Sequence, residues 1–237
     1  MIVDVVMHPS EIALLKGRVL NGVCCVVFDV LRATSSILTG LAHGVAEVVP
    51  VETIEEARGA ALARAGAILG GERNGDRIEG FDLGNSPLEY RSVAGAVVVT
   101  TTTNGTVALR ACTGADTVWV GAVLNLGALA REIRRAAPEK LMLVCAGTFE
   151  TMALEDVWAA GALLEAFADA QWTDSARCAA AVASQWPDPA QALRFSRNGR
   201  ALLEAGRGAD LDWCASLNKL DVVGEMLGGV IRARRSA

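Results

Sequence analysis

The stretch that decides the fold is Val26-Val-Phe-Asp-Val-Leu-Arg-Ala-Thr-Ser-Ser36. It begins as an apolar, β-branched run, which is typical of a strand covered on both faces, and it ends in hydroxyl residues that open a helical pattern. Asp29 and Arg32 stand at the change from one pattern to the other. Open α/β sheets bind their ligands just beyond the carboxyl ends of the strands. We therefore expect this turn to form half of a site for a small phosphorylated acid, with a divalent metal beside the phosphate.

Alternating strand and helix patterns continue on both sides of this stretch. Such alternation predicts a sheet with helices packed against it. The chain has 237 residues and 52% of them are hydrophobic, which is enough to bury a sizeable core. We predict a single α/β domain over residues 1–237, with a three-layer α/β/α fold and a largely parallel or mixed central sheet. Residues 169–217 are Ala-rich and helical in pattern, and we interpret them as a C-terminal helical elaboration of that domain.

Composition excludes several classes of function. A net charge of -5 argues against a nucleic-acid partner, and we interpret the one basic cluster, residues 232–235, as a solvated tail. Six cysteines without a C-x-x-C pair indicate reduced thiols. There is no signal-peptide pattern and no apolar run of about 20 residues, so we expect a cytoplasmic protein without a membrane partner. The sequence leaves open whether the chain forms a homo-oligomer.

Four polar clusters follow predicted strands. In the first, Arg32 offers planar donors for a phosphate or carboxylate, and a helix that begins near Thr34 or Ser35 would direct backbone N–H groups at the same anion. The alternative is that Thr34 or Ser35 only caps the helix while Arg32 is a surface charge. Read by itself, this cluster does not decide between the two interpretations.

The second cluster lies in residues 70–92, which show neither a strand nor a helix period. Loops of this length in compact domains are usually functional or disordered. Carboxylates such as Glu72 and Asp82, on a glycine-rich backbone, suit an oxygen-liganded Mg²⁺, whereas charge counts alone favour a solvated acidic loop. We expect an ordered loop, because it carries apolar anchors of its own, namely Ile78, Phe81, Leu83, Leu88 and Tyr90.

The third cluster is a neutral anion cradle at a strand-to-helix junction, in which hydroxyl, amide and backbone groups act as donors. Its candidate residues are Thr103, Asn104, Gly105 and Thr106. The alternative is that the threonines only complete a strand. The fourth cluster, Glu155 and Asp156, follows Ala146-Gly-Thr148. These carboxylates would hold a metal or act as a general base, unless they only complement a helix dipole.

In this order the clusters resemble the 2-phosphosulfolactate phosphatase family of ComB-like phosphatases. The matching strings are Phe28-Asp-Val-Leu-Arg-Ala-Thr-Ser35, Gly70-Gly-Glu-Arg73, Glu79-Gly-Phe-Asp-Leu-Gly-Asn-Ser-Pro-Leu-Glu-Tyr90, Thr101-Thr-Thr-Asn-Gly-Thr106, and Cys145-Ala-Gly147 with Leu154-Glu-Asp156. The resemblance implies a Mg²⁺-dependent phosphoric monoester hydrolase. Its reaction would convert 2-phospho-3-sulfolactate into 3-sulfolactate and phosphate, a step toward coenzyme M, or would act on a close phosphorylated hydroxy acid.

On this basis we assign roles to the candidate residues. We expect Asp29, Glu72 and Asp82 to be the Mg²⁺ ligands, because hard oxygen donors suit that ion. Arg73 would bind the second acidic group of the substrate, and Glu155 or Asp156 would be the general base. Attack by Asp29 as a covalent nucleophile is an alternative, and a non-catalytic phosphometabolite-binding protein is the alternative function. The phosphoryl group would be held by Arg32, Thr34, Ser35, Asn104, Gly105 and Thr106, with Asn85, Ser86 and Thr103 as further substrate contacts.

Overall fold

The computed structural model describes residues 1–234, so Arg235 of the expected basic tail lies outside the described residues. Within residues 1–234, eleven strands form one sheet in the order β5-β4-β6-β3-β11-β10-β7-β2-β8-β1-β9. The strands are β1 (Ile2–Val6), β2 (Val23–Phe28), β3 (Glu47–Pro50), β4 (Ile68–Arg73), β5 (Asp76–Arg77), β6 (Val97–Thr101), β7 (Thr117–Gly121), β8 (Lys140–Cys145), β9 (Gln171–Trp172), β10 (Gly224–Leu227) and β11 (Val230–Ala233). The helices are α1 (Pro9–Leu15), α2 (Ala33–Ala42), α3 (Ile54–Leu62), α4 (Gly105–Ala111), α5 (Leu126–Ala136), α6 (Leu154–Leu164), α7 (Asp174–Gln185), α8 (Pro189–Phe195), α9 (Arg197–Glu204) and α10 (Gly208–Cys214).

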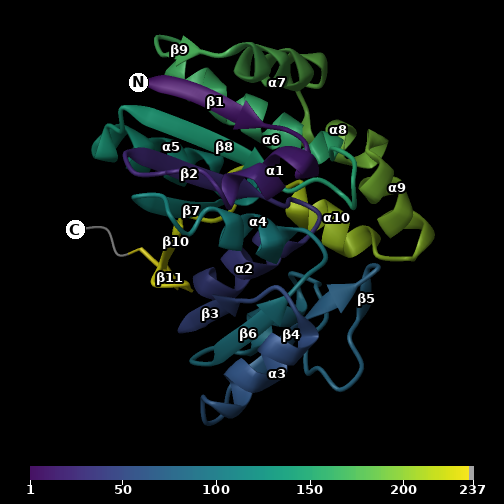
Figure 1. Cartoon of the computed structure of the whole chain (residues 1–237). Coiled ribbons are helices and arrows are strands. Elements are labelled where there is room, and N and C mark those ends of the chain that lie inside the picture. Colours follow the sequence, from purple (N-terminus) through teal and green to yellow (C-terminus); the bar gives the residue numbers. More distant parts are fainter. Residues whose placement is uncertain (235–237) are drawn as a thin grey trace.

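The sheet consists of two groups of parallel strands. One group runs β9-β1-β8-β2-β7 and the other runs β4-β6-β3. The hairpin of β10 and β11 joins them, because it pairs antiparallel with β7 on one side and with β3 on the other (Figure 1). The predicted mixed sheet is thus confirmed. A Gly228-Gly229 turn, with both φ angles positive, makes the tight hairpin connection.

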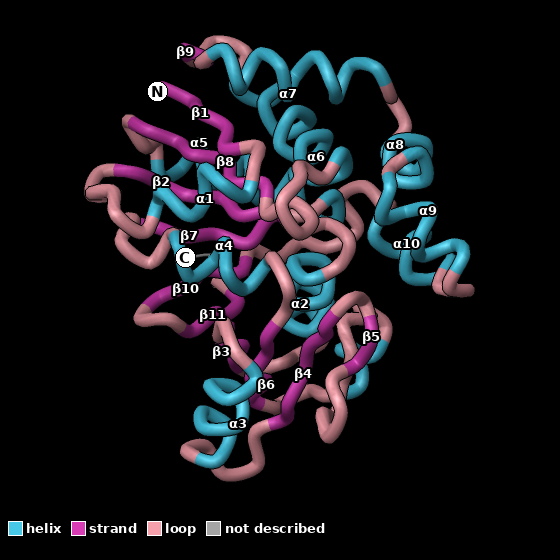
Figure 2. The backbone as a smooth tube through the Cα atoms, turned by 45° about the vertical axis from the view of Figure 1, so that its right-hand side comes forward, coloured by secondary structure: helices cyan, strands magenta, loops and turns pink. Residues whose placement is uncertain are grey.

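Helices cover both faces of the sheet and complete three layers (Figure 2). On one face, apolar residues of α1, α2 and α4 share a core with β2 and β7. On the other face, α5, α6 and α7 pack against β1, β2 and β8. All six residues of β2 are buried, which explains why its sequence lacks the apolar–polar alternation of a half-exposed strand. The predicted α/β/α architecture is correct.

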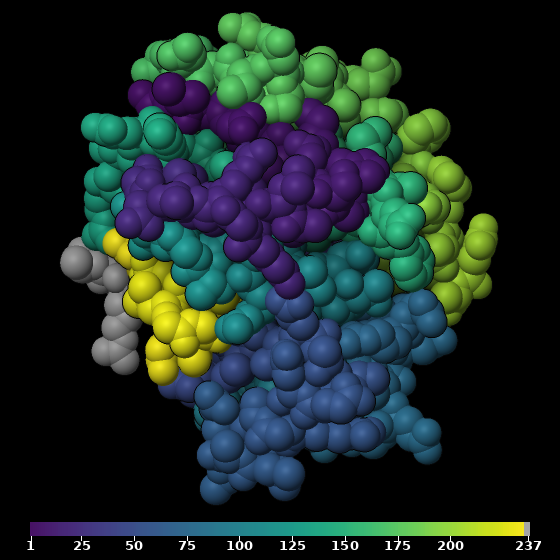
Figure 3. Space-filling model, viewed as in Figure 1, coloured from purple at the N-terminus to yellow at the C-terminus, as the bar shows by residue number. Residues whose placement is uncertain are grey.

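The predicted elaboration is largely helical. Patterns in residues 175–184, 189–193 and 198–203 correspond to α7, α8 and α9, whereas α10 and the two-residue strand β9 were not predicted. Figure 3 shows the later part of this segment, in yellow-green, beside the blue surface of the β4–β5 region. An ion pair between Arg207 and Asp76 joins these two parts of the chain.

Residues 70–92 are ordered, as predicted, but they contain more regular structure than the sequence pattern indicates. Strand β4 extends to Arg73 and turns into β5, and a 3-10 helix covers Glu89–Ser92. Four of the five apolar anchors are buried, while Leu88 is half-buried. Gly71 allows β4 to approach β6, since a Cβ at this position would lie 2.0 Å from the Thr101 carbonyl oxygen.

Three composition-based expectations can be compared with the structure. The basic cluster is not a solvated tail over its described residues, because Arg232 pairs with Glu47, and Arg234 pairs with Glu132 and Glu225. Attraction to acidic side chains on neighbouring elements holds these arginines against the sheet. All six cysteines are free thiols, and only Cys178 is exposed. Across residues 1–234, no helix combines the length and apolar character that a membrane crossing requires.

Candidate active site

A cavity of about 390 Å³ opens where the carboxyl ends of β2, β4, β6 and β8 approach one another, and α9 forms its opposite wall. Most of the sequence-predicted site residues line this cavity, although they come from all four clusters. The structure therefore brings together side chains that are separated by up to 127 positions in sequence. The predicted residues that line it are Asp29, Arg32, Glu72, Asn85, Thr103, Asn104, Glu155 and Asp156.

Asp29 follows β2 directly and lies on the floor of the cavity. Its Oδ1 accepts a hydrogen bond of 3.1 Å from the Ala33 N–H, so the carboxylate caps the first turn of α2. Gly105, at the start of α4, approaches its other oxygen closely, since a Cβ there would lie 2.5 Å from Asp29 Oδ2. A glycine is thus required for the β6–α4 junction to pack against this carboxylate.

Glu72 connects two loops that border the cavity. One oxygen accepts from the Gly75 N–H in the β4–β5 turn, and the other accepts from the Thr103 N–H after β6, both at 2.7 Å. The side chain is only 7% exposed. Its carboxylate therefore fixes the position of both loops, while each oxygen retains a second lone pair toward the cavity.

Glu155 and Asp156 are adjacent in sequence but differ in their hydrogen bonds. Both oxygens of Asp156 are used, by the Val30 N–H at 2.8 Å and the Gly147 N–H at 3.1 Å. Glu155 receives one hydrogen bond from Asn198 at 2.6 Å, and its buried Oε2 has no partner in residues 1–234. Asp156 thus ties the ends of β2 and β8 together, whereas Glu155 presents a free acceptor.

The carboxylates on the floor repel one another. Burial, together with the nearby charges of Glu72 and Glu155, raises the pKa of Asp29 to about 7. Burial also raises the pKa values of Glu155 and Asp156, and the charge of Glu155 adds to the shift at Asp156. None of the four floor carboxylates forms an ion pair within residues 1–234. This concentration of negative charge calls for a bound cation or proton.

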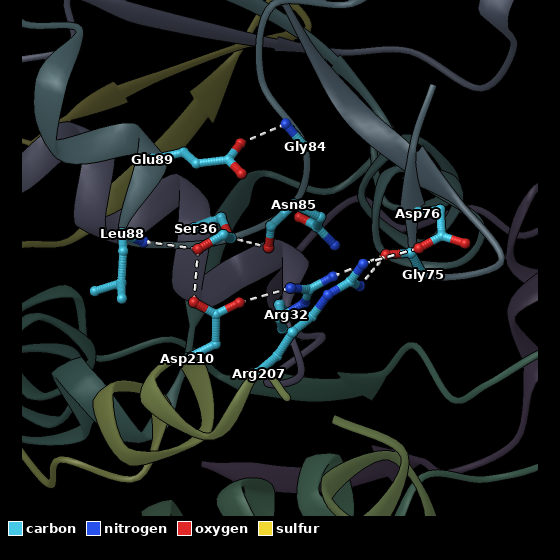
Figure 4. Close-up of polar contacts among 11 residues, drawn as sticks. Arg32, Ser36, Gly75, Asp76, Gly84, Asn85, Leu88, Glu89, Arg207 and Asp210 are labelled. Carbon is cyan, nitrogen blue, oxygen red and sulfur yellow. Dashed lines mark hydrogen bonds and ion pairs between the residues drawn. The ribbon is translucent and has the colours of Figure 1, made fainter. Parts of the chain in front are cut away.

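Arg32 has a different environment at the edge of the same cavity. Its guanidinium pairs with Asp210 at 2.6 Å, and both side chains are nearly inaccessible to solvent. A second nitrogen donates to the Gly75 carbonyl at 3.1 Å (Figure 4). Ser86 donates to the other oxygen of Asp210 at 2.6 Å. Arg32 is therefore a neutralised, fixed donor and not the surface charge of the alternative interpretation.

Three predicted phosphate-binding hydroxyls do not line the cavity. Thr34 accepts from the Asp29 N–H at 3.1 Å, and Ser35 donates to the Val30 carbonyl at 2.7 Å. Thr106 exchanges hydrogen bonds with Thr102. These hydroxyls are used within the chain, because short hydroxyl side chains bond to the nearest backbone groups. The helix-capping alternative is wrong for Thr34 and Ser35, since the N-cap residue of α2 is Arg32, whose side chain makes no capping hydrogen bond. Gly105 shapes the site in another way, because its lack of a side chain lets the start of α4 pack against Asp29.

Arg73 and Asp82 also lie apart from the cavity lining. Arg73 donates to the Glu52 carbonyl and to the Thr101 hydroxyl, which lie beside β4. Asp82 is exposed, and its carboxylate accepts from the Leu69 N–H at 2.9 Å. Ser86 lines a neighbouring cavity together with Asp210. The structure thus does not bring Asp82 to Asp29 and Glu72, or Arg73 to the expected substrate.

The helical segment contributes three residues to the site that were not predicted. Asn198 donates to Glu155, Arg207 lines the cavity, and Asp210 pairs with Arg32. No motif marks these three residues in the sequence, because Asn198 and Asp210 belong to short helices and Arg207 lies in the turn between them. A buried partner for Arg32 was nevertheless to be expected once that arginine was placed beside a sheet.

The donor set fits a hard divalent cation with few protein ligands. No three His, Cys, Asp or Glu side chains within residues 1–234 form a ready-made metal cage. Mg²⁺ usually binds through one or two carboxylates, several waters and substrate phosphate. Asp29 and Glu72 can supply the carboxylates, and the uncompensated charge of the floor favours such an ion.

Comparison with known proteins gives one family. The family model described as 2-phosphosulpholactate phosphatase matches residues 11–228. A relative from Carboxydothermus hydrogenoformans is 36% identical, over 94% of this chain and 92% of its own length. Relatives from Deinococcus radiodurans (41%, over 86% and 87%) and Gloeobacter violaceus (42%, over 84% and 86%) are similar, and all three are named "Probable 2-phosphosulfolactate phosphatase". The chain belongs to the 2-phosphosulpholactate phosphatase family.

Proposed function

We propose that this protein is a Mg²⁺-dependent phosphatase that hydrolyses 2-phospho-3-sulfolactate, or a close phosphorylated hydroxy acid, to the hydroxy acid and phosphate. The observation that carries the proposal is the floor of Asp29, Glu72, Glu155 and Asp156, four buried carboxylates without a cationic partner in residues 1–234. A pocket for a dianion gains little from so many negative groups unless a cation neutralises them. Family membership supports the same reaction.

Asp29 and Glu72 would hold the cation. When bound, Mg²⁺ would neutralise part of the charge on the floor and polarise the phosphoryl oxygens. Asp29 is held by the first turn of α2, and Glu72 by two loop N–H groups, so their oxygens are already in place. Such preorganisation lowers the cost of stabilising charge in the transition state.

The phosphoryl group would bind between this floor and the donors around it. Arg32 supplies fixed N–H groups at one edge, and the side-chain amide of Asn104 lies at the start of α4. These groups would stabilise the equatorial oxygens as the bond from phosphorus to the substrate oxygen breaks. Thr103 also lines the cavity, and its buried hydroxyl has no protein partner in residues 1–234.

Glu155 is the stronger candidate for the general base. Its free Oε2 can accept the proton of the attacking water while the water oxygen bonds to phosphorus. The phosphorus–alkoxide bond then breaks, the leaving alkoxide takes a proton from solvent water, and Glu155 returns its own proton to solvent. Asn198 orients Glu155, and burial raises the pKa of its carboxyl, which makes the ionised form a stronger base. Asp156 already uses both oxygens to hold backbone N–H groups.

The experiment is phosphate release from 2-phospho-3-sulfolactate by the purified protein before and after EDTA treatment, with Mg²⁺ then restored. We expect EDTA to abolish turnover and Mg²⁺ to recover it. Asp29→Asn should lose at least about a hundredfold in kcat/KM at saturating Mg²⁺, as for a single electrostatic group in a preorganised site. Asp169→Asn, which changes an exposed carboxylate remote from the cavity, is the matched control.

Turnover that resists EDTA would overturn the role of the metal. Substrate binding without phosphate release under any condition would favour a phosphometabolite-binding protein. A cytoplasmic location, the lack of a nucleic-acid partner and the oligomeric state stay predictions.

A further inference from the structure

The cavity has an acidic floor and a basic end. Among the described residues that line it, Arg32 and Arg207 are the only cationic side chains. Much of the opposite wall is apolar, with Ala201 and Leu202 of α9 and Ala205 directly after this helix. Any acidic group of a ligand that does not contact the metal site therefore has only this basic end as a source of charged donors.

Arg32 and Arg207 converge on one acceptor. Both guanidiniums donate to the carbonyl oxygen of Gly75, at the tip of the β4–β5 turn (Figure 4). Two hydrogen bonds to a shared oxygen place the donating nitrogens within roughly 6 Å of each other. The phosphate and the sulfonate of 2-phospho-3-sulfolactate lie on adjacent carbons, so one molecule can reach both guanidiniums at this spacing.

The two arginines differ in how far their charge is compensated. Arg32 is buried against Asp210, with side-chain exposures of 5% and 7%. Arg207 is 33% exposed, and its partner Asp76 is 81% exposed. Exposed ion pairs are weak and exchange readily with solvent or ligand. Two of the five N–H donors of Arg207 are used within residues 1–234, which leaves the others for a ligand.

We propose that Arg207 binds the sulfonate group of the substrate, and so determines substrate choice. This inference rests on the proposed function for the identity of the substrate. A guanidinium can donate two charge-assisted hydrogen bonds, one to each of two sulfonate oxygens. The role passes from Arg73 to Arg207, because Arg73 donates to groups beside β4 and does not line the cavity.

The test compares two substrates that differ in one group. In 2-phospholactate a methyl group replaces the sulfonated methylene of 2-phospho-3-sulfolactate. For Arg207→Gln we expect KM for the sulfonated substrate to rise about tenfold to a hundredfold with little change in kcat, the loss expected for a charged hydrogen-bonding group. The kinetic constants for 2-phospholactate should stay within about twofold on the same argument. Arg207→Lys, which keeps the charge and loses the planar fork, should recover part of the preference.

Arg194→Gln is the matched control, because Arg194 belongs to the same helical segment, forms an exposed pair with Asp212 and does not line the cavity. Arg194→Gln should change the kinetic constants for neither substrate. Equal losses on both substrates in Arg207→Gln would show that Arg207 does not act through the sulfonate and would overturn the inference.

A calorimetric binding experiment distinguishes a failure of this inference from a failure of the proposed function. If wild-type protein releases no phosphate, the proposed function fails, but binding of 2-phospho-3-sulfolactate can still be measured. Weaker binding of the sulfonated compound to Arg207→Gln, with 2-phospholactate unaffected, would then support the role of Arg207. Unchanged binding of both compounds would overturn it.

Discussion

The floor and the basic end of the cavity handle buried charge in opposite ways. On the floor, burial and the nearby charges of Glu72 and Glu155 raise the pKa of Asp29, and none of these carboxylates forms an ion pair within residues 1–234. At the basic end, Arg32 is matched by Asp210 at 2.6 Å. A buried ion pair with good geometry needs no ligand to balance its charge. Several buried like charges without an ionic partner do need one. For this reason we propose that a metal binds at the floor, while the basic end offers a preformed donor.

The largest expected effect comes from breaking the pair at the basic end. Asp210→Ala would leave Arg32 buried without a counter-charge and would remove the acceptor of Ser86. We expect a loss of about 3–5 kcal/mol in the free energy of unfolding, measured by urea denaturation. Asp212→Ala, on the same helix but in an exposed pair with Arg194, should cost no more than about 1 kcal/mol. Equal losses of stability in the two variants would show that the buried Arg32–Asp210 pair contributes no more to stability than the exposed Arg194–Asp212 pair.

A smaller effect concerns the floor and depends on pH. The pKa of Asp29 is raised from 3.8 to about 7, so the folded protein binds more protons than the unfolded chain between these values. The free energy of unfolding of the metal-free protein should therefore fall as pH rises through this window, by about 1–3 kcal/mol between pH 5 and pH 8. Thermal or urea melts in EDTA measure this slope.

Two comparisons sharpen the pH experiment. Saturating Mg²⁺ should flatten the slope by favouring the ionised carboxylates, and Asp29→Asn should remove much of it. A metal-free protein that becomes more stable from pH 5 to pH 8 would contradict the electrostatic description of the floor.

The smallest effect is expected for Asp82, and it tests whether this carboxylate belongs to the acidic floor. Asp82→Asn changes an exposed carboxylate that contacts the Leu69 N–H and lies outside the cavity lining. We expect kcat/KM and the Mg²⁺ concentration for half-maximal activity to change by no more than about twofold, because exposed substitutions usually have small effects. A large shift in the Mg²⁺ requirement would restore Asp82 as a metal ligand and extend the floor toward β5.

Local sequence patterns determined much of the fold. Alternating strand and helix patterns predicted the three layers, and the apolar run before Asp29 predicted a fully buried strand, because covering helices require apolar residues on both faces. The same reasoning placed Asp29, Glu72, Asn104 and Glu155 near strand ends, where they do line one cavity. Extra strand structure in residues 70–77 was not predicted, because this part of β4 and β5 contains glycine and charged residues in place of an apolar period.

Only the tertiary structure decided which polar groups face the cavity. Thr34, Ser35 and Thr106 satisfy nearby backbone groups, and a sequence does not show whether a hydroxyl points inward or toward its own helix. Asp210 reaches Arg32 across 178 positions, and Asn198 reaches Glu155 across 43. Such contacts depend on how α9 and α10 pack against the sheet. The sequence by itself therefore determined the layers and the acidic floor, while the packing of the helical segment decided the basic end, because burial and long-range pairing arise only when distant elements meet.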